Sequence, residues 1–271
     1  MARPLDLPEY ERPPIDEVAI GVQFEPIEGI SEAHIGLYWQ SLRDSYPRTE
    51  SKPRFEIPVE SFSSDSQFVT PQVTIAPTKG MLGRTWLISE DEDYLIQVQN
   101  THFVHNWRRR DSVYPRFDLL KDKFWQTYEQ FLSVLSSEQL KSPALTQIEL
   151  SYINWITNMT MPEFFRPAGA TKIEAKQMRS QAENQLFVAR YMAEDETGNP
   201  IGRLHIHCQQ AMHEVQRVPG NLMSLIFRVP IFPGWDRSRL NNVLELGRNA
   251  IVRSFTDLTT DEAHREWLRQ K

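Results

Sequence analysis

Apolar and polar residues alternate along several stretches of the chain, the pattern of strands with one buried face. The clearest stretch is residues 15–24, where Val18, Ile20, Val22 and Phe24 are apolar and most residues between them are polar or small. Further strands are expected at residues 55–59, 68–75, 86–89, 95–104, 146–157, 171–191 (interrupted), 202–215 and 222–231. Acidic or polar turns at 90–93 and 194–200 join neighbouring strands, which predicts antiparallel pairing.

Helical periodicity replaces this alternation in a few segments. Residues 116–140 carry apolar side chains at helical spacing: Phe117, Leu120, Phe124, Tyr128, Phe131 and Leu135. A second long helix is predicted from Arg237 to Phe255, capped by Asp236, with Leu240, Val243, Leu244, Leu246, Ala250 and Ile251 facing inward. Shorter helices are expected between Ser31 and Pro47 and over residues 261–271.

Together these elements predict an α+β protein in which a largely antiparallel sheet, or sheets, is packed by two or three long helices. Residues 1–14 contain four prolines and read as an extended lead-in. Residues 15–143 and 144–271 each contain strands followed by a helix, so we expect an N-terminal and a C-terminal α+β half within one compact unit. The order of elements hints at two similar halves, although no repeat is visible at the level of residues.

Composition narrows the functional classes. The 271 residues have a formal net charge of −6, so the chain as a whole repels a phosphate backbone. The single cysteine, Cys208, excludes an intramolecular disulfide and leaves a reducing compartment as the default. No signal peptide or membrane span is apparent, and we expect a cytoplasmic protein without membrane contact.

Motifs for catalysis and cofactor binding are missing from the sequence. There is no nucleophile elbow, and the scattered glycines form no phosphate-binding loop, so no catalytic residue and no cofactor are assigned. His205 and His207 share one face of a strand and could begin a metal site, but no further ligand has a known metal spacing. We therefore interpret them as half-buried strand histidines and assign no metal. Whether the protein is an enzyme stays open.

The most unusual feature is a cluster of arginines and aromatic residues that precedes the long helix at 116–140. Its members are the candidate ligand- or partner-binding residues: His105, Asn106, Trp107, Arg108, Arg109, Arg110, Tyr114 and Arg116. Guanidinium groups bind carboxylates and phosphates bidentately and stack on tryptophan, so the cluster could bind an anionic ligand, an acidic protein or, through Arg108–Arg110, a nucleic-acid end. The alternative is that these arginines pair with carboxylates of the same chain.

Aromatic residues in loop-like segments provide a second candidate surface. Phe164 and Phe165 form one pair, and Phe232 and Trp235 form another. Exposed apolar groups of this kind often mark interfaces, whereas packing at the edge of the core is the alternative.

Three stretches of the sequence resemble a known protein family. They are Pro13-Pro14 followed by Glu17-Val18, then Leu95 to Asn106-Trp107-Arg108, and Tyr114-Pro115-Arg116-Phe117. In this combination the chain resembles a sporadically distributed family of uncharacterised bacterial proteins. The resemblance implies a bacterial cytoplasmic protein and would suit a defence-associated gene neighbourhood, but it supplies no reaction.

From these features we expect a non-enzymatic binding or regulatory protein that acts through a protein partner, as in an accessory subunit of a bacterial defence or toxin–antitoxin type system. The alternative is a protein or enzyme that binds a small anionic ligand between the curved sheet and the helix at 116–140, with His105, Arg108 and Tyr114 at the mouth of the pocket. Neither the identity of the partner nor the oligomeric state follows from the sequence.

Overall fold

The computed structural model describes residues 4–62, 74–76, 82–110, 112–169, 182, 184–213 and 215–271, with the backbone alone for 74–76. Parts of the strands expected at 68–75 and 171–191 lie outside these residues. Within them, the α+β class and the antiparallel sheet are confirmed.

One antiparallel sheet of nine strands organises the described chain, in the order β2-β5-β6-β7-β1-β8-β11-β10-β9. Its strands are β1 (Ile15–Phe24), β2 (Arg48–Lys52), β5 (Arg84–Ile88), β6 (Tyr94–Gln99), β7 (His102–Arg108), β8 (Leu145–Ile156), β9 (Leu186–Glu194), β10 (Pro200–Met212) and β11 (Pro219–Pro230). A separate pair consists of β3 (Arg54–Glu56) and β4 (Thr74–Ala76).

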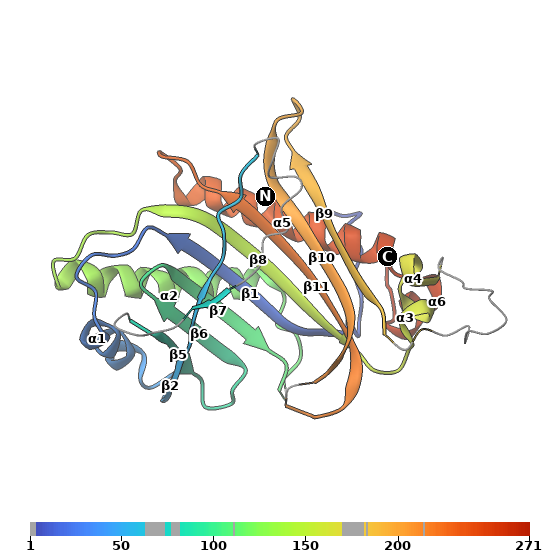
Figure 1. Ribbon diagram of the computed structural model, residues 1–271, viewed down its shortest axis with the longest axis horizontal. Coiled ribbons are helices and arrows are strands. Elements are labelled where there is room, and N and C mark those ends of the chain that lie inside the picture. Colours follow the sequence, from blue (N-terminus) through green and yellow to red (C-terminus); the bar gives the residue numbers. More distant parts are fainter. Residues whose placement is uncertain are drawn as a thin grey trace.

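Two long helices, α2 (Phe117–Ser137) and α5 (Arg237–Leu258), cover one face of the sheet (Figure 1). The shorter helices are α1 (Glu32–Leu42), α3 (Met161–Phe164), α4 (Arg166–Gly169) and α6 (Asp261–Glu266). Asp236 caps α5 as expected, because its side chain accepts a hydrogen bond from the backbone N–H of Arg239 at 2.8 Å. No helix in the described parts of the chain is long and apolar enough to cross a membrane.

The two halves of the chain repeat the same order of elements: a strand, one or two short helices, a meander of strands and a long helix. The first strands of the two halves, β1 and β8, pair at the centre of the sheet, with Ile20 opposite Leu150. The last strands, β7 and β11, flank them on either side. The halves therefore share one sheet and one helix-covered face.

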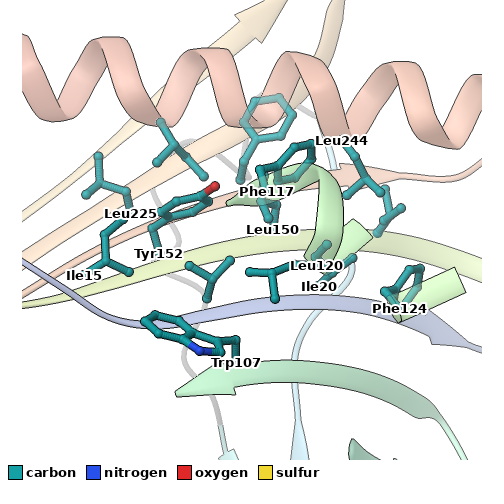
Figure 2. Close-up of a cluster of buried hydrophobic side chains, with 14 of the residues drawn as sticks. Ile15, Ile20, Trp107, Phe117, Leu120, Phe124, Leu150, Tyr152, Leu225 and Leu244 are labelled. Carbon is teal, nitrogen blue, oxygen red and sulfur yellow. The ribbon is translucent and has the colours of Figure 1, made fainter. Parts of the chain in front are cut away.

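The core lies between the sheet and the two long helices (Figure 2). All six apolar positions expected to face inward on α2 are buried. On α5 the expectation is wrong for Leu246, which is 40% exposed, whereas Gly247 and Arg248 face inward. The buried face of α5 contains Leu240, Leu244, Ile251 and Phe255, which follow one another at intervals of four or seven residues. Leu246 does not share this spacing and therefore points away from the core.

The expectation of one strand over residues 95–104 is wrong, because the chain turns at Asn100 and Thr101 between β6 and β7. Within the arginine–aromatic cluster, His105 to Arg108 belong to β7 in the interior of the sheet. The turn at Asn100 and Thr101 coincides with four consecutive polar residues, Gln99 to His102. Across them the core-facing positions change from even numbers, Ile96 and Val98, to odd numbers, Phe103 and Trp107, so the sequence does carry a signal of the turn.

The face of the sheet opposite the helices, called the open face below, is crossed by residues 53–60 (Figure 1). Gln99 Nε2 donates to the carbonyl of Phe55 at 2.8 Å, and Gln23 Nε2 donates to the carbonyl of Ile57 at 2.9 Å. At the far end of the segment, the backbone N–H of Glu60 donates to Gln147 Oε1 at 2.9 Å. Amide side chains of three different strands thus hold this segment against the sheet.

Candidate functional site

A cavity of about 280 Å³ lies where the N-terminal segment, the start of α2, helix α5 and the sheet meet. Its apolar wall includes Ile15, Phe117, Leu225, Ile251 and Phe255. Ile15 and Leu225 lie beside Tyr152 on the strands, and Phe117 approaches from the first turn of α2 (Figure 2). The wall therefore combines side chains from both halves of the chain.

Tyrosine hydroxyls supply polar groups within this apolar surface. The hydroxyls of Tyr114 and Tyr152 are 2.9 Å apart, and the hydroxyl of Tyr10 lies 2.9 Å from Oγ1 of Thr256. Burial raises the pKa of Tyr114 to about 12 and that of Tyr152 well above its ordinary value. These hydroxyls therefore remain protonated at neutral pH and can donate hydrogen bonds.

Arg116 contributes a positive charge at the mouth of the cavity. Its side chain is 58% exposed and forms an ion pair with Glu9, in which Nη1 and Oε1 are 2.9 Å apart. Exposed pairs of this kind typically stabilise a protein by only about 0–1 kcal/mol. A ligand carboxylate could therefore take the place of Glu9 at small cost.

A second arginine, Arg248, lines the interior of the cavity but is neutralised by neighbours. Its guanidinium lies 5.2 Å from the centre of the Phe117 ring, and Nη2 is 2.8 Å from Oε2 of Glu245. Lys121 also contacts Glu245. Because both Arg248 and Glu245 are buried, Glu245 holds the Arg248 side chain in a fixed position in the wall.

Helix α2 begins at the same cavity. Arg116 occupies the N-cap position with φ 77° and ψ 152°, a conformation that residues other than glycine rarely adopt. Its side chain makes no capping hydrogen bond. The positive end of the helix dipole is thus directed toward the region that Arg116, Phe117 and Asp118 line.

The outer wall consists of the N-terminal segment, which pairs with the C-terminal end of the chain. Tyr10 forms an isolated antiparallel bridge with Arg269. The backbone N–H of Arg12 donates to the carbonyl of Trp267 at 3.1 Å, and that of Gln270 donates to the carbonyl of Glu9 at 2.8 Å. The C-terminal end of the described chain therefore holds in place the N-terminal segment that forms this wall.

The sequence-predicted site residues are distributed over several surfaces. His105 and Trp107 point into the helix-covered core: His105 Nε2 lies 3.0 Å from the Tyr46 hydroxyl, and Trp107 Nε1 donates to Ser112 Oγ at 3.1 Å. Burial lowers the pKa of His105 to about 3, so its imidazole is neutral at pH 7. Neither side chain lines the cavity.

Four other residues of the cluster, Asn106, Arg108, Arg109 and Arg110, make contacts within the chain. Asn106 donates to the carboxylate of Glu17. Arg108 donates to the carbonyl of Glu92 at 3.0 Å, and Arg109 donates to the carbonyl of Pro13 at 2.9 Å. The backbone N–H of Arg110 donates to Asp93 Oδ1 at 3.2 Å.

Of the eight predicted residues, only Tyr114 and Arg116 line the 280 Å³ cavity. His105 and Arg108 do not line this cavity, and their expected position at the mouth of a pocket between the sheet and α2 stays a prediction. Binding of a partner to the rest of the cluster stays a prediction.

Among the aromatic pairs, Phe164 and Phe165 are fully buried, so they cannot form an exposed surface. Phe232 is exposed and packs edge-to-face on Trp235, with ring centres 6.0 Å apart.

A second polar constellation lies on the open face. The carboxylate of Glu60 contacts Arg203 and His205 of β10, and Arg228 Nε donates to Glu149 Oε2 at 2.6 Å on the neighbouring strands. His205 is thus engaged by a carboxylate, and within the described residues no group of three or more metal-ligating side chains is found. The contacts of Glu60 hold the end of the 53–60 segment against β10.

Sequence reasoning missed Glu9, Tyr10, Tyr152 and Arg248 as lining residues. Only Arg248 carried a usable signal, because it occurs at core spacing on a helix, four residues after Leu244 and three before Ile251. A charged residue at such a position requires a buried partner or a site. The other three come together only through tertiary contacts.

No protein-family model matches the chain, and no curated protein matches it significantly. The resemblance carried by Pro13-Pro14, Asn106-Trp107-Arg108 and Tyr114-Pro115 stays a hypothesis.

Proposed function

We propose that the protein binds a small amphipathic molecule, with an apolar body and a carboxylate head, in the cavity between the N-terminal segment, α2 and α5. The carrying observation is the cavity itself, in which an apolar wall surrounds the protonated hydroxyls of Tyr114 and Tyr152, with Arg116 at the mouth. Its volume of about 280 Å³ lies just below the range typical of pockets for drug-sized ligands, about 300–1,000 Å³, which indicates a small ligand. A medium-chain or aromatic carboxylic acid has the corresponding size and chemistry.

The two ends of such a ligand would contact different parts of the site. Burial of the apolar body against Phe117, Leu225 and Ile251 provides the main favourable free energy, about 25 cal/mol per Å² of apolar surface removed from water. The carboxylate would accept hydrogen bonds from Arg116 and face the positive end of the α2 dipole. Head-group recognition therefore provides specificity more than affinity.

Calorimetric titration and thermal denaturation of the purified chain test this proposal, with aliphatic and aromatic carboxylic acids compared with alcohols of the same length. We expect the carboxylates to bind more tightly and to raise the Tm. At one hundred times the Kd, bound ligand should stabilise the fold by about 2.7 kcal/mol.

Two variants, each with a control, test the apolar wall and the head-group site independently. Val252→Phe places a ring in the cavity wall and should abolish binding, whereas Leu246→Phe, on the same helix but outside the wall, should leave it unchanged. Arg116→Gln should weaken binding of carboxylates but not of alcohols, and Arg265→Gln serves as its surface control. Absence of binding by every acid and alcohol, or binding that survives Val252→Phe in a folded variant, would reject the proposal.

A further inference from the structure

The two edges of the sheet differ in how they are protected against pairing with another strand. Edge strand β2 is short and carries the charged residues Arg48, Glu50 and Lys52. The Nζ atom of Lys52 lies 2.6 Å from Oε2 of Glu50. Charged side chains on a short edge strand are a common means of preventing edge-to-edge association. The β2 edge is therefore protected.

The opposite edge, β9, lacks these features. It has nine residues, contains no proline and has charged side chains only at Arg190 and Glu194. Its inner side pairs with β10 from Leu186 to Glu194, and among the described residues no strand pairs with its outer side. The outer backbone N–H and C=O groups thus form a template for a further strand.

The side chains of β9 are apolar and exposed on both faces of the sheet. Leu186, Val188 and Met192, on the open face, are 66%, 43% and 43% exposed, and Tyr191, on the other face, is 52% exposed. A solvated edge strand normally places polar groups at such positions. This run of apolar groups marks an interaction surface.

We propose that β9 pairs antiparallel with β9 of a second copy of this chain, about a two-fold axis that passes between the two Ala189 residues perpendicular to the sheet. Such an interface is self-complementary, as two-fold symmetry requires. It joins the two sheets into one continuous sheet and is independent of the ligand proposed for the cavity.

The choice of register follows from the sequence of β9. An axis at Ala189 places Val188 opposite Arg190, Phe187 opposite Tyr191 and Leu186 opposite Met192, so each apolar side chain has a large cross-strand neighbour. An axis at Arg190 would place two arginines opposite each other, which is destabilising. An axis at Tyr191 would place Val188 opposite Glu194 and would leave Leu186 outside the paired segment.

Self-association is tested by sedimentation equilibrium of the full chain over a wide range of concentration. We expect a reversible, concentration-dependent dimer. Val188→Lys places a lysine opposite Arg190 of the second copy in both symmetry-related pairs and should abolish the dimer. Val188→Glu places a carboxylate at the same position and should preserve it. A charge change on the protected edge, Glu50→Lys, is the control and should have no effect.

Oxidative cross-linking tests the register independently of affinity. Ala189→Cys brings two cysteines together at the axis and should yield a disulfide-linked dimer, whereas Tyr191→Cys faces Phe187 and should not; the native Cys208 is buried. A chain that stays monomeric at all concentrations would overturn the proposal, and so would binding of an extended peptide to the β9 of a monomer. Equal dimerisation of the lysine and glutamate variants, or equal cross-linking at both positions, would overturn the assigned register.

Discussion

His205 Nε2 lies 2.7 Å from Oε1 of Glu60, and both side chains are buried. The second carboxylate oxygen of Glu60 accepts a hydrogen bond from Arg203 Nη1 at 2.5 Å. Burial raises the pKa of Glu60, but the hydrogen bonds from His205 and Arg203 outweigh this effect, so the net pKa is lowered. Residues 53–60 are thus held on the open face by a buried carboxylate that is ionised at neutral pH.

We predict that Glu60→Ala lowers the free energy of unfolding by about 3–5 kcal/mol, because removal of one partner from a buried charged network is strongly destabilising. Glu56→Ala, in the same segment but exposed, is the control and should change it by less than about 0.5 kcal/mol. Urea denaturation at pH 7 measures both. Similar values for the two variants would show that Glu60 contributes no special stability.

Acidification should weaken the same contact. A carboxyl group whose folded pKa is lowered contributes stability that is present above its ordinary pKa of 4.5 and is lost as the pH falls through the lowered folded value. We therefore expect stability to fall less steeply below pH 4.5 in Glu60→Ala than in the wild type. Parallel pH profiles of the two proteins would contradict this assignment.

His105 should cause a separate pH dependence at milder acidity. Burial lowers its folded pKa from 6.5 to about 3, so between these values the unfolded chain binds a proton that the folded chain does not. The free energy of unfolding is therefore unaffected by His105 above pH 6.5. On acidification toward pH 3 it falls by roughly 1.4 kcal/mol per pH unit because of this residue.

We predict that His105→Gln makes the slope of unfolding free energy between pH 6 and 4.5 shallower by about this amount. Tyr46→Phe removes the hydroxyl that lies 3.0 Å from His105 but keeps the buried imidazole, so it should retain the wild-type slope. If the Tyr46 variant also loses the slope, the hydrogen bond, and not burial, sets the pKa of His105.

Two glycines on helices should respond oppositely to alanine. A Cβ added at Gly247 would lie 2.7 Å from Cδ1 of Phe227, so helix α5 or the ring must shift. A Cβ added at Gly36 in α1 would meet nothing within 4 Å. We expect Gly247→Ala to destabilise the fold by about 1–3 kcal/mol despite its better helix propensity, and Gly36→Ala to stabilise it by about 0.5–1 kcal/mol. Thermal and urea denaturation distinguish the signs; stabilisation by both would mean that α5 approaches the sheet less closely.

The tyrosine pair in the cavity predicts an alkaline transition. Burial raises the pKa of Tyr114 from 10 in the unfolded chain to about 12 in the folded protein. Its contribution to the free energy of unfolding is therefore fully present below pH 10 and is lost as the pH rises toward 12. Tyr114→Phe should therefore make the loss of stability between pH 10 and 11 shallower by about 1.4 kcal/mol per pH unit. Urea denaturation at these pH values checks the slope, and an unchanged slope would show that Tyr114 ionises without regard to burial.

Local pattern was sufficient for α2 and for most strands. The spacing from Phe117 to Leu135 permits only one continuous buried face, and the alternation in residues 15–24 and 146–157 identifies the two central strands. The turn at Asn100 and Thr101 was missed, although four consecutive polar residues, Gln99 to His102, interrupt the alternation there. Local pattern also misplaced His105, because nothing in a single strand indicates which face the helices will cover.

The sequence alone thus determines the class of fold, the long helices and an antiparallel sheet, because period and turn chemistry are properties of neighbouring residues. Only the tertiary structure decides that Tyr10, Tyr152 and Arg248 surround one cavity, that Glu60 is buried against Arg203, and that β9 lies at an edge of the sheet formed by the described residues. These relations join residues that are far apart in the chain. They depend on strand order and on helix placement, which no local pattern encodes.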